Sequence, residues 1–148
     1  MTNTGPTTVQ GNVGVSPGSA IVGFPPGIVT GGAIHQTDSV AAQAETDLTT
    51  LYNVLAGQAC NTNLTGQNLG GLTLTPGVYC FATSAQLTGI LTLDAQGNPN
   101  ATFVFQIGST FTTASGASVI MINGGSTCGV AWQVGTSATL GTGSTVVG

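Results

Sequence analysis

One segment of the chain carries apolar residues at helical spacing. Residues 38–56 contain no Gly or Pro, and apolar side chains recur there at steps of three and four residues, which places them on one face of an α-helix. Those positions are Val40, Ala44, Leu48, Leu51 and Leu55. Thr37 or Asp38 can cap the helix, because its side chain accepts a hydrogen bond from a free N–H group of the first turn, and Gly57 follows as a stop. We predict one helix over 38–56, whose aliphatic stripe packs against another part of the protein.

The remaining pattern is that of short strands and turns. β-Branched and aromatic residues dominate Thr102–Ile107, Ser118–Ile122 and Gly129–Val134, which is typical of strands. Leu87–Asp94 reads as one further strand, closed by the turn sequence AQGNPN. Before the helix, Val and Ile alternate with Gly, Asn and Pro, so strands there should be very short. The pattern predicts a mainly β protein.

A repeat organises the second half of the chain. FQIGS at 105–109 recurs as WQVGT 27 positions later, and SGASV at 115–119 recurs in the same register as TGSTV. Repeats of about 20–50 residues indicate solenoids, and three strands of about five residues with their turns need this length. We predict a β-solenoid with stacked parallel strands and an aliphatic core. The repeated Thr, Ser and Gly positions then form a flat array of hydroxyl and methyl groups.

Aromatic residues share one position of the repeat, at Phe105 and Trp132. Such a ladder either binds sugar rings or stacks in the core, and the apolar neighbours favour the core.

Charge is nearly absent from the sequence. The chain has 148 residues, no Lys or Arg, four acids and one His, and 3% of its residues are charged, whereas average usage is about 25%. Its 41% hydrophobic content indicates a folded chain rather than a disordered one. Without cations the protein lacks the groups that bind nucleic-acid phosphates, and a net charge of −4 opposes an anionic membrane surface. We expect neither nucleic acid nor membrane as a partner.

The few titratable residues do not form a catalytic set. His35 precedes the helix and no G-x-S-x-G elbow is present, so we expect a surface loop residue. Glu45 and Asp47, two positions apart on a helix, do not face each other. Asp38 is a candidate cap, and Asp94 precedes a turn whose backbone it can bind. We expect no enzymatic activity and no cofactor.

Three cysteines are present. Cys60 and Cys80 flank a short strand pattern, and the residues leave two alternatives open: a disulfide, which would favour an oxidising compartment, or free thiols. Cys128 is left over and is expected to be buried as a small hydrophobe. No CxxC or HxxxH spacing is present, so no zinc site is expected.

Several long stretches resemble the widespread microbial ice-binding proteins. They include LGGLTLTPGVYCF (69–81), FVFQIGS (103–109) and CGVAWQVGTSATLGTGSTVVG (128–148), and together with other segments they cover nearly the whole chain in the family's order. The resemblance implies an irregular right-handed β-solenoid of triangular coils with one long α-helix packed alongside. Residues 1–148 would form a single domain with the helix inserted at about 38–56.

The resemblance also implies a binding face. Some family members carry a T-A/G-x-T/N motif on a flat face that binds ice. It is matched by Thr4-Gly5-Pro6-Thr7 and by Thr142-Gly143-Ser144-Thr145. A Ser version stands at Ser115-Gly116-Ala117-Ser118, and Thr88-Gly89 keeps the first half. The candidate ice-binding residues are Thr4, Gly5, Thr7, Thr88, Ser115, Gly116, Ser118, Thr142, Gly143, Ser144 and Thr145. Which of them point outward is left open.

The implied function is that of a secreted antifreeze protein that adsorbs to the ice crystal surface and inhibits ice growth and recrystallisation. The alternative is a structural extracellular module, an adhesin or fibre repeat, in which Thr ladders only stabilise strands. A pectin-lyase-like enzyme ranks third, because such enzymes need clustered acids and basic residues.

Family members usually carry a further strand before this sequence and at least one more coil after it. We therefore expect a chain without its leader and trimmed at both ends. Uncovered strand edges would lower its stability or lead to self-association through the coil ends.

Overall fold

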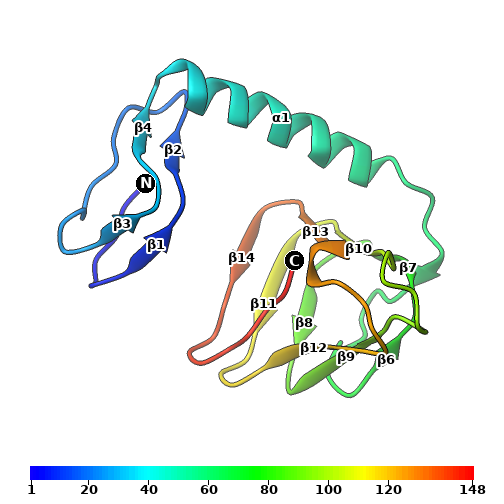
Figure 1. Cartoon of the computed structure of the whole chain (residues 1–148). Coiled ribbons are helices and arrows are strands. Elements are labelled where there is room, and N and C mark those ends of the chain that lie inside the picture. Colours follow the sequence, from blue (N-terminus) through cyan, green and yellow to red (C-terminus); the bar gives the residue numbers. More distant parts are fainter. The chain divides into compact units, whose positions relative to one another are not determined.

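The computed structural model comprises residues 1–148, which group into two compact units, Met1–Asn53 and Val54–Gly148 (Figure 1). The first unit contains two small parallel sheets. β1 (Thr8–Gln10) pairs with β3 (Ile28–Thr30), and β2 (Val13–Val15) pairs with β4 (Ile34–Gln36). Each strand has three residues, which confirms the very short strands expected before the helix.

The predicted helix is present as α1, Ser39–Ala56. Asp38 is the cap: its Oδ1 accepts a hydrogen bond from the Ala41 N–H at 2.9 Å. Ala41 is buried against Gly14 of β2, which fixes the start of the helix on the first unit. Within that unit Leu48 and Leu51 remain exposed. Packing of the aliphatic stripe therefore stays a prediction.

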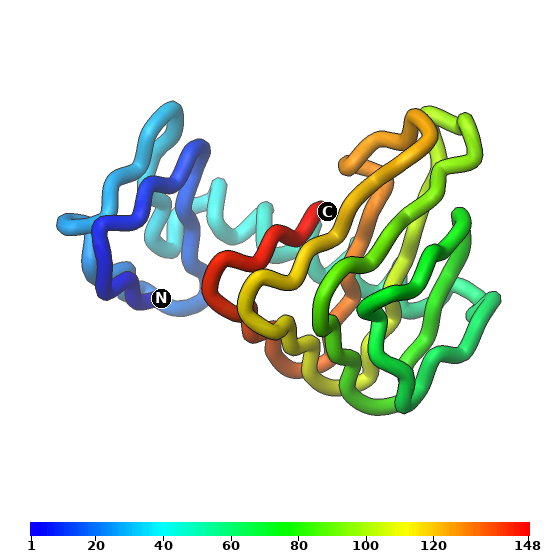
Figure 2. The backbone as a smooth tube through the Cα atoms, turned by 90° about the horizontal axis from the view of Figure 1, so that it is seen from below, coloured from blue at the N-terminus to red at the C-terminus, as the bar shows by residue number.

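The second unit consists of three parallel sheets. One has the order β13-β10-β7-β5, the next β14-β11-β8 and the third β12-β9-β6. Along the chain the strands are β5 (Thr62–Asn63), β6 (Thr73–Leu74), β7 (Gly77–Phe81), β8 (Ala85–Leu87), β9 (Ile90–Asp94), β10 (Phe103–Ile107), β11 (Thr110–Thr113), β12 (Ser118–Ile122), β13 (Val130–Val134) and β14 (Ser137–Thr139). From β7 onward the chain visits the three sheets in the same order in every turn, and Figure 2 shows these turns side by side.

The repeat found in the sequence corresponds to the pairing register of the strands in the sheets. Phe105 pairs with Trp132 and Gln106 with Gln133 in the parallel β10–β13 ladder. Ser118 forms a parallel bridge with Thr145, at the same offset. The predicted in-register stacking of parallel strands is confirmed.

The segment 87–94 is not one strand, so that prediction is wrong. β8 ends at Leu87 and β9 begins at Ile90, in a different sheet. Between them Gly89 has a φ of +89°, a conformation that residues with a Cβ rarely adopt. The chain turns a corner here, although the apolar pattern runs across it without a break.

The core of the second unit lies between the three sheets. Phe103, Phe105 and Ile107 of β10 are completely buried, as are Leu91 and Leu93 of β9. The ring of Phe105 stacks on Tyr79, with 5.6 Å between centroids, and on Trp132, with 4.1 Å. The aromatic ladder therefore belongs to the core, as the apolar neighbours indicated.

The chain that follows the helix is fastened to this core. Cys60 and Cys80 form a disulfide with a Cα–Cα distance of 5.9 Å, which settles the alternative left open by the sequence. Gln106 of β10 donates two hydrogen bonds through Nε2, to the backbone oxygen of Leu55 at 2.7 Å and to that of Gln58 at 2.8 Å. One sheet residue thus satisfies carbonyl groups at the C-terminal end of α1.

Cys128 is exposed, contrary to the expectation of a buried side chain. It lies in a single 3₁₀ turn, Thr127–Gly129, on the connection that leads into β13. The pattern of apolar residues does not specify whether anything packs against this connection. No helix of the protein combines the length and the apolar character needed to cross a membrane.

Candidate functional site

The outer side of the sheet β8–β11–β14 carries an array of hydroxyl groups. In β11 the side chain of Phe111 points into the core, where it is 2% exposed. Strand side chains alternate between the two faces of a sheet, so Thr110 and Thr112 point outward. β14 repeats the pattern with Ser137 and Thr139. Figure 1 shows β14, β11 and β8 side by side.

The outward residues form columns across the strands. Thr110 pairs with Ser137, and its hydroxyl donates to Ser84 Oγ at 2.8 Å. A second column comprises Gln86, Thr112 and Thr139. The residues just before the strands are stacked as well: the backbone N–H of Ser109 donates to the backbone oxygen of Thr83, and that of Thr136 donates to the backbone oxygen of Ser109. We call these nine residues the hydroxyl face: Thr83, Ser84, Gln86, Ser109, Thr110, Thr112, Thr136, Ser137 and Thr139. Its neighbouring strands are about 4.8 Å apart.

No charged residue belongs to the hydroxyl face. The only acid in the second unit is Asp94, at the end of β9 in a different sheet. The Asn123 side chain and the Gln96 N–H donate to its carboxylate, and these hydrogen bonds hold the pKa of Asp94 below its ordinary value of 3.8. The face itself has no titrating group, so its charge does not change with pH.

The T-G-x-T positions form turns beside this face rather than flat strands. Gly116 and Gly143 have φ values of +70° and +69°, and each turns the chain from one sheet to the next. Thr142 accepts a hydrogen bond through its backbone oxygen from Gly116 N–H at 3.0 Å, so the two turns stack. Thr88, Ser115 and Thr142 are exposed on this edge, and we call them the corner hydroxyls.

The other motif residues lie elsewhere. Ser118 and Thr145 pair with each other beyond the corner, next to β9. Ser144 is partly buried, and its hydroxyl donates to Gly141 O at 2.7 Å, so it serves its own turn. Thr4, Gly5 and Thr7 belong to the first unit, where the Thr7 hydroxyl donates to Asn3 Oδ1 at 2.8 Å.

Sequence reasoning missed the hydroxyl face itself. Thr110, Thr112, Ser137 and Thr139 were not among the expected site residues. The signal that reveals them is polar alternation repeated at the known offset: Thr-Phe-Thr at 110–112 and Ser-Ala-Thr at 137–139 each place a hydroxyl on both sides of an apolar residue.

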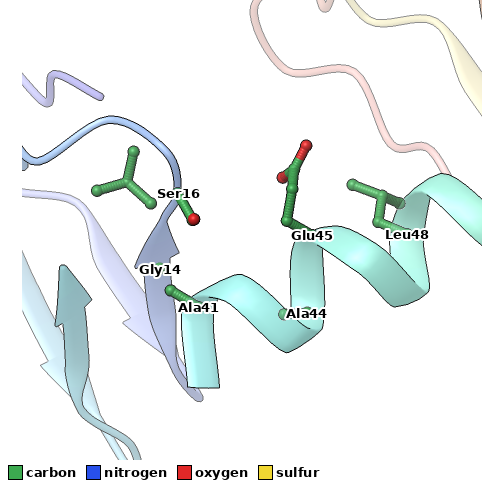
Figure 3. A pocket seen from close by; sticks show the side chains of 7 residues that line it. Gly14, Ser16, Ala41, Ala44, Glu45 and Leu48 are labelled. Carbon is green, nitrogen blue, oxygen red and sulfur yellow. The ribbon is translucent and has the colours of Figure 1, made fainter. Parts of the chain in front are cut away.

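The first unit has a pocket of about 280 Å³ between β2 and the start of α1 (Figure 3). Figure 3 shows Glu45 and Leu48 on the helix side and Ser16 near the strand. Glu45 is the one titratable residue in its lining, with no second acid or base to exchange a proton with. The pocket offers no catalytic pair.

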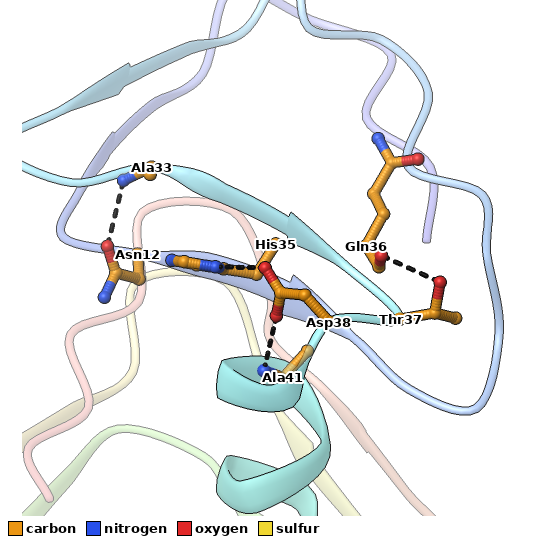
Figure 4. A network of polar contacts seen from close by, with 7 residues as sticks. All are labelled: Asn12, Ala33, His35, Gln36, Thr37, Asp38 and Ala41. Atoms are coloured by element: carbon orange, nitrogen blue, oxygen red, sulfur yellow. Dashed lines mark hydrogen bonds and ion pairs between the residues drawn. The ribbon is translucent and has the colours of Figure 1, made fainter.

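His35 is engaged at the helix cap (Figure 4). Its Nδ1 lies 2.6 Å from Asp38 Oδ2, while Asp38 Oδ1 accepts from Ala41 N–H. The backbone hydrogen bond from Ala41, followed by the contact with His35, lowers the pKa of Asp38 below 3.8. Both side chains therefore serve the start of α1. No group of three or more His, Cys, Asp or Glu residues lies close enough together to hold a metal ion.

Comparison with known proteins shows to which family this chain belongs. A family model described as ice-binding-like matches residues 1–148. The chain belongs to this family. It is 59% identical over 148 residues to an ice-binding protein of Nostoc sp. (strain HG1), covering all of this chain and 54% of the relative. It thus spans about half the length of that protein.

Solved structures of the family share the fold. The crystal structure of an ice-binding protein from an Antarctic biological consortium has a TM-score of 0.88 and 40% identity, with 96% of this chain and 68% of that one covered. The crystal structure of the ice-binding protein from the Antarctic ascomycete Antarctomyces psychrotrophicus has a TM-score of 0.91 and 38% identity, with 97% and 70% covered. The resemblance read from the sequence is confirmed.

Proposed function

We propose that this protein binds ice through the hydroxyl face and the adjoining corner hydroxyls, and thereby inhibits ice growth and recrystallisation. The observation that carries the proposal is the set of uncharged, in-register Thr and Ser columns on β8, β11 and β14, in a chain of the ice-binding-like family.

The chemistry of the columns suits a crystal of water. Ice is an uncharged lattice of hydrogen bonds, and a Thr or Ser hydroxyl both donates and accepts. The χ1 angle of Thr is restricted, so a column such as Thr112–Thr139 is ordered before contact and loses little entropy on binding. A charged group would instead hold its own water in an arrangement that the lattice does not accept. Each contact is weak, and the repeated columns let many act together.

Adsorption to the crystal surface explains how ice growth is inhibited without an enzymatic step. Bound molecules pin the ice front, the ice between them must grow with a curved surface, and curvature lowers its growth temperature. The result is a gap between melting and freezing, called thermal hysteresis. The activity needs a surface and no catalytic group.

The motif residues divide by their place in the fold. We assign ice contact to the corner hydroxyls and a shape-setting role to Gly116 and Gly143, whose positive φ values make the turns. Ser118 and Thr145 extend the contact around the corner, while Ser144 stabilises its turn. Thr4, Gly5 and Thr7 would contribute from the first unit.

We also infer that the turns of the second unit are triangular, right-handed coils of a solenoid, and that residues 1–148 belong to one ice-binding domain. Three parallel sheets visited in a constant order support the triangular cross-section. Connections between parallel strands of a sheet are right-handed in nearly all proteins, which supports the hand.

We propose that the protein is secreted and that its partner is the ice crystal surface, with no nucleic acid, no membrane and no catalytic reaction involved. The Cys60–Cys80 disulfide supports an oxidising compartment. The chain has no Lys or Arg, the side chains that supply most of the affinity of proteins for the nucleic-acid backbone.

The structural-module alternative is favoured by a different surface. Ile90 of β9 and Ile120 and Ile122 of β12 are 53%, 41% and 38% exposed, and apolar side chains at a protein surface favour association. A fibre or adhesin repeat would assemble through this side, and sedimentation at rising concentration would reveal it.

The direct test replaces a central hydroxyl by a charge. We expect Thr112→Glu to weaken adsorption by at least about tenfold, because stripping water from a carboxylate costs more than the 1.4 kcal/mol that a tenfold change represents. The matched control is Thr73→Glu, an exposed Thr of β6 on the neighbouring sheet. Thermal hysteresis is measured for each variant at equal concentration, with circular dichroism to confirm folding. Loss of thermal hysteresis in Thr73→Glu, together with parent-like thermal hysteresis in Thr112→Glu, would show that ice binds elsewhere.

A further inference from the structure

The hydroxyl face changes character at its first strand, β8. In the column that contains Thr112 and Thr139, the position on β8 is Gln86. Gln86 is exposed between the buried Ala85 and Leu87, so its side chain points outward like the two Thr residues. Its amide has no hydrogen-bond partner within the protein. One column thus combines two short, stiff side chains with a long and mobile one.

The surface is also hollowed at this strand. A pocket of about 270 Å³ is lined by Ser84 and Gln86 and by the neighbouring segment Gly66, Gln67 and Asn68. Ser84 accepts the hydrogen bond of Thr110, so one lone pair of its hydroxyl is already used. The flat array of short side chains formed by β11 and β14 gives way to a depression on the side of β8.

The segment 66–68, which lies beside β8 but precedes β6 and β7 in the chain, does not continue the array. Asn68 forms a parallel bridge with Gln86. Its Oδ1 accepts from Gly70 N–H at 2.8 Å and from Thr88 N–H at 3.0 Å, and its Nδ2 donates to Thr88 Oγ1 at 3.0 Å. The side chain of Asn68 is therefore occupied with local structure. Asn68 therefore does not add a hydroxyl group to the column of Gln86.

A flat crystal plane fits poorly on a column that combines Gln86 with Thr112 and Thr139. Gln loses more rotamer freedom on ordering than Thr, whose χ1 angle is already restricted. Gln is also longer than Thr, so an extended Gln86 stands above the level of Thr112 and Thr139. A crystal plane seated on the two Thr residues therefore meets a side chain that must fold away into the depression.

We propose that Gln86 is the residue that ends the ice-contacting column of Thr112 and Thr139 at β8, so that in this column only the two Thr residues of β11 and β14 contact ice. This inference rests on the proposed function, because it assigns the boundary of the same surface. It predicts that a short hydroxyl side chain at position 86 extends the contact by one strand.

The test uses a reciprocal pair of variants. Gln86→Thr completes the column, and Thr112→Gln interrupts it at the centre. Gln67→Thr is the matched control, because Gln67 lines the same depression but lies in the segment 66–68, outside the columns. Thermal hysteresis and the lowest concentration that stops ice recrystallisation are measured for the full chain, with thermal unfolding to verify the fold.

We expect Gln86→Thr to lower the recrystallisation end point by about threefold or more, since one ordered long side chain fewer is worth that much in affinity. Thr112→Gln should raise the end point, and Gln67→Thr should leave it unchanged. Parent-like activity of Gln86→Thr, with Thr112→Gln impaired, would overturn this inference and leave the proposed function standing. Parent-like activity of both folded variants would count against the proposed face itself.

Discussion

The stacked aromatic core allows a quantitative prediction. Phe105 is fully buried, and its ring lies between those of Tyr79 and Trp132, with centroid distances of 5.6 and 4.1 Å. Replacement by Ala removes the ring, leaves a cavity and breaks both stacked contacts. A buried Phe→Ala change costs about 3–5 kcal/mol, and each aromatic pair contributes about 0.5–1.5 kcal/mol beyond area burial. We therefore expect Phe105→Ala to reduce the free energy of unfolding of the second unit by about 4–5 kcal/mol.

That loss is a large part of the total for a domain whose stability is about 5–15 kcal/mol. At about 4–8 °C per kcal/mol for a unit of this size, the melting temperature of the second unit should fall by roughly 15–40 °C. Guanidinium denaturation gives the free energy, with Trp132 fluorescence and far-UV circular dichroism as two probes. Trp132 is the single Trp of the chain and stacks on Phe105, so its signal reports on the second unit.

Thr112→Ala is the matched control on the outer side of the neighbouring sheet, where we expect a change within about 0.5 kcal/mol. If Phe105→Ala also lost less than about 1 kcal/mol, the ring would not be part of a close-packed core. The stacked-coil account of the second unit would then be wrong.

Two further predictions concern the disulfide and the acids. Reduction of Cys60–Cys80, which closes a loop of sequence separation 20, should cost about 3 kcal/mol, measured as a lower guanidinium midpoint with dithiothreitol than without; an unchanged midpoint would mean that the bond adds no stability. The pKa values of Asp38 and Asp94 lie below 3.8 in the folded protein, so their stabilising effect is complete well above that pH and is lost as the pH falls through the folded values. The midpoint should therefore fall between pH 5 and pH 2, and fall less in an Asp38→Asn, Asp94→Asn double variant; an equal fall in both proteins would refute this assignment.

Periodicity and repetition in the sequence were sufficient to predict the helix and the register of the stacked strands. The helix has a continuous 3.6-residue pattern and a cap at Asp38, both of which are local properties. The pairing of Phe105 with Trp132 follows from the repeat itself, since equivalent residues of neighbouring coils must lie side by side. These features do not depend on how distant parts of the chain pack.

Features set by the corners could not be predicted in the same way. Gly89 turns the chain between two sheets inside an unbroken apolar pattern. The sequence pattern of these two strands therefore looks like that of a single strand. The exposure of Cys128 depends on whether anything packs against the connection into β13, which the pattern of apolar residues does not specify. Pattern alone treats a lone cysteine as a small core residue.

The position of the hydroxyl face depends on strand parity. A shift of one residue in where β11 begins would exchange Thr112 with Phe111 between the surface and the core. The T-G-x-T motif drew the expectation to residues such as Thr142 and Thr145, which lie at and beyond a corner. The larger array of Thr and Ser on β11 and β14 became visible only once the inward direction of Phe111 was known.

The most direct test of ice binding is partition of the protein between a growing single crystal of ice and the surrounding liquid. Cys128 is the one free cysteine and lies on the connection into β13, outside the sheet that bears the hydroxyl face, so a fluorescent maleimide attached there leaves that face unmodified. The account predicts that the labelled protein is incorporated into the ice in defined planes. It also predicts that a Thr112→Glu, Thr139→Glu double variant stays in the liquid. Exclusion of the folded parent protein from the crystal, or equal incorporation of both proteins, would contradict it.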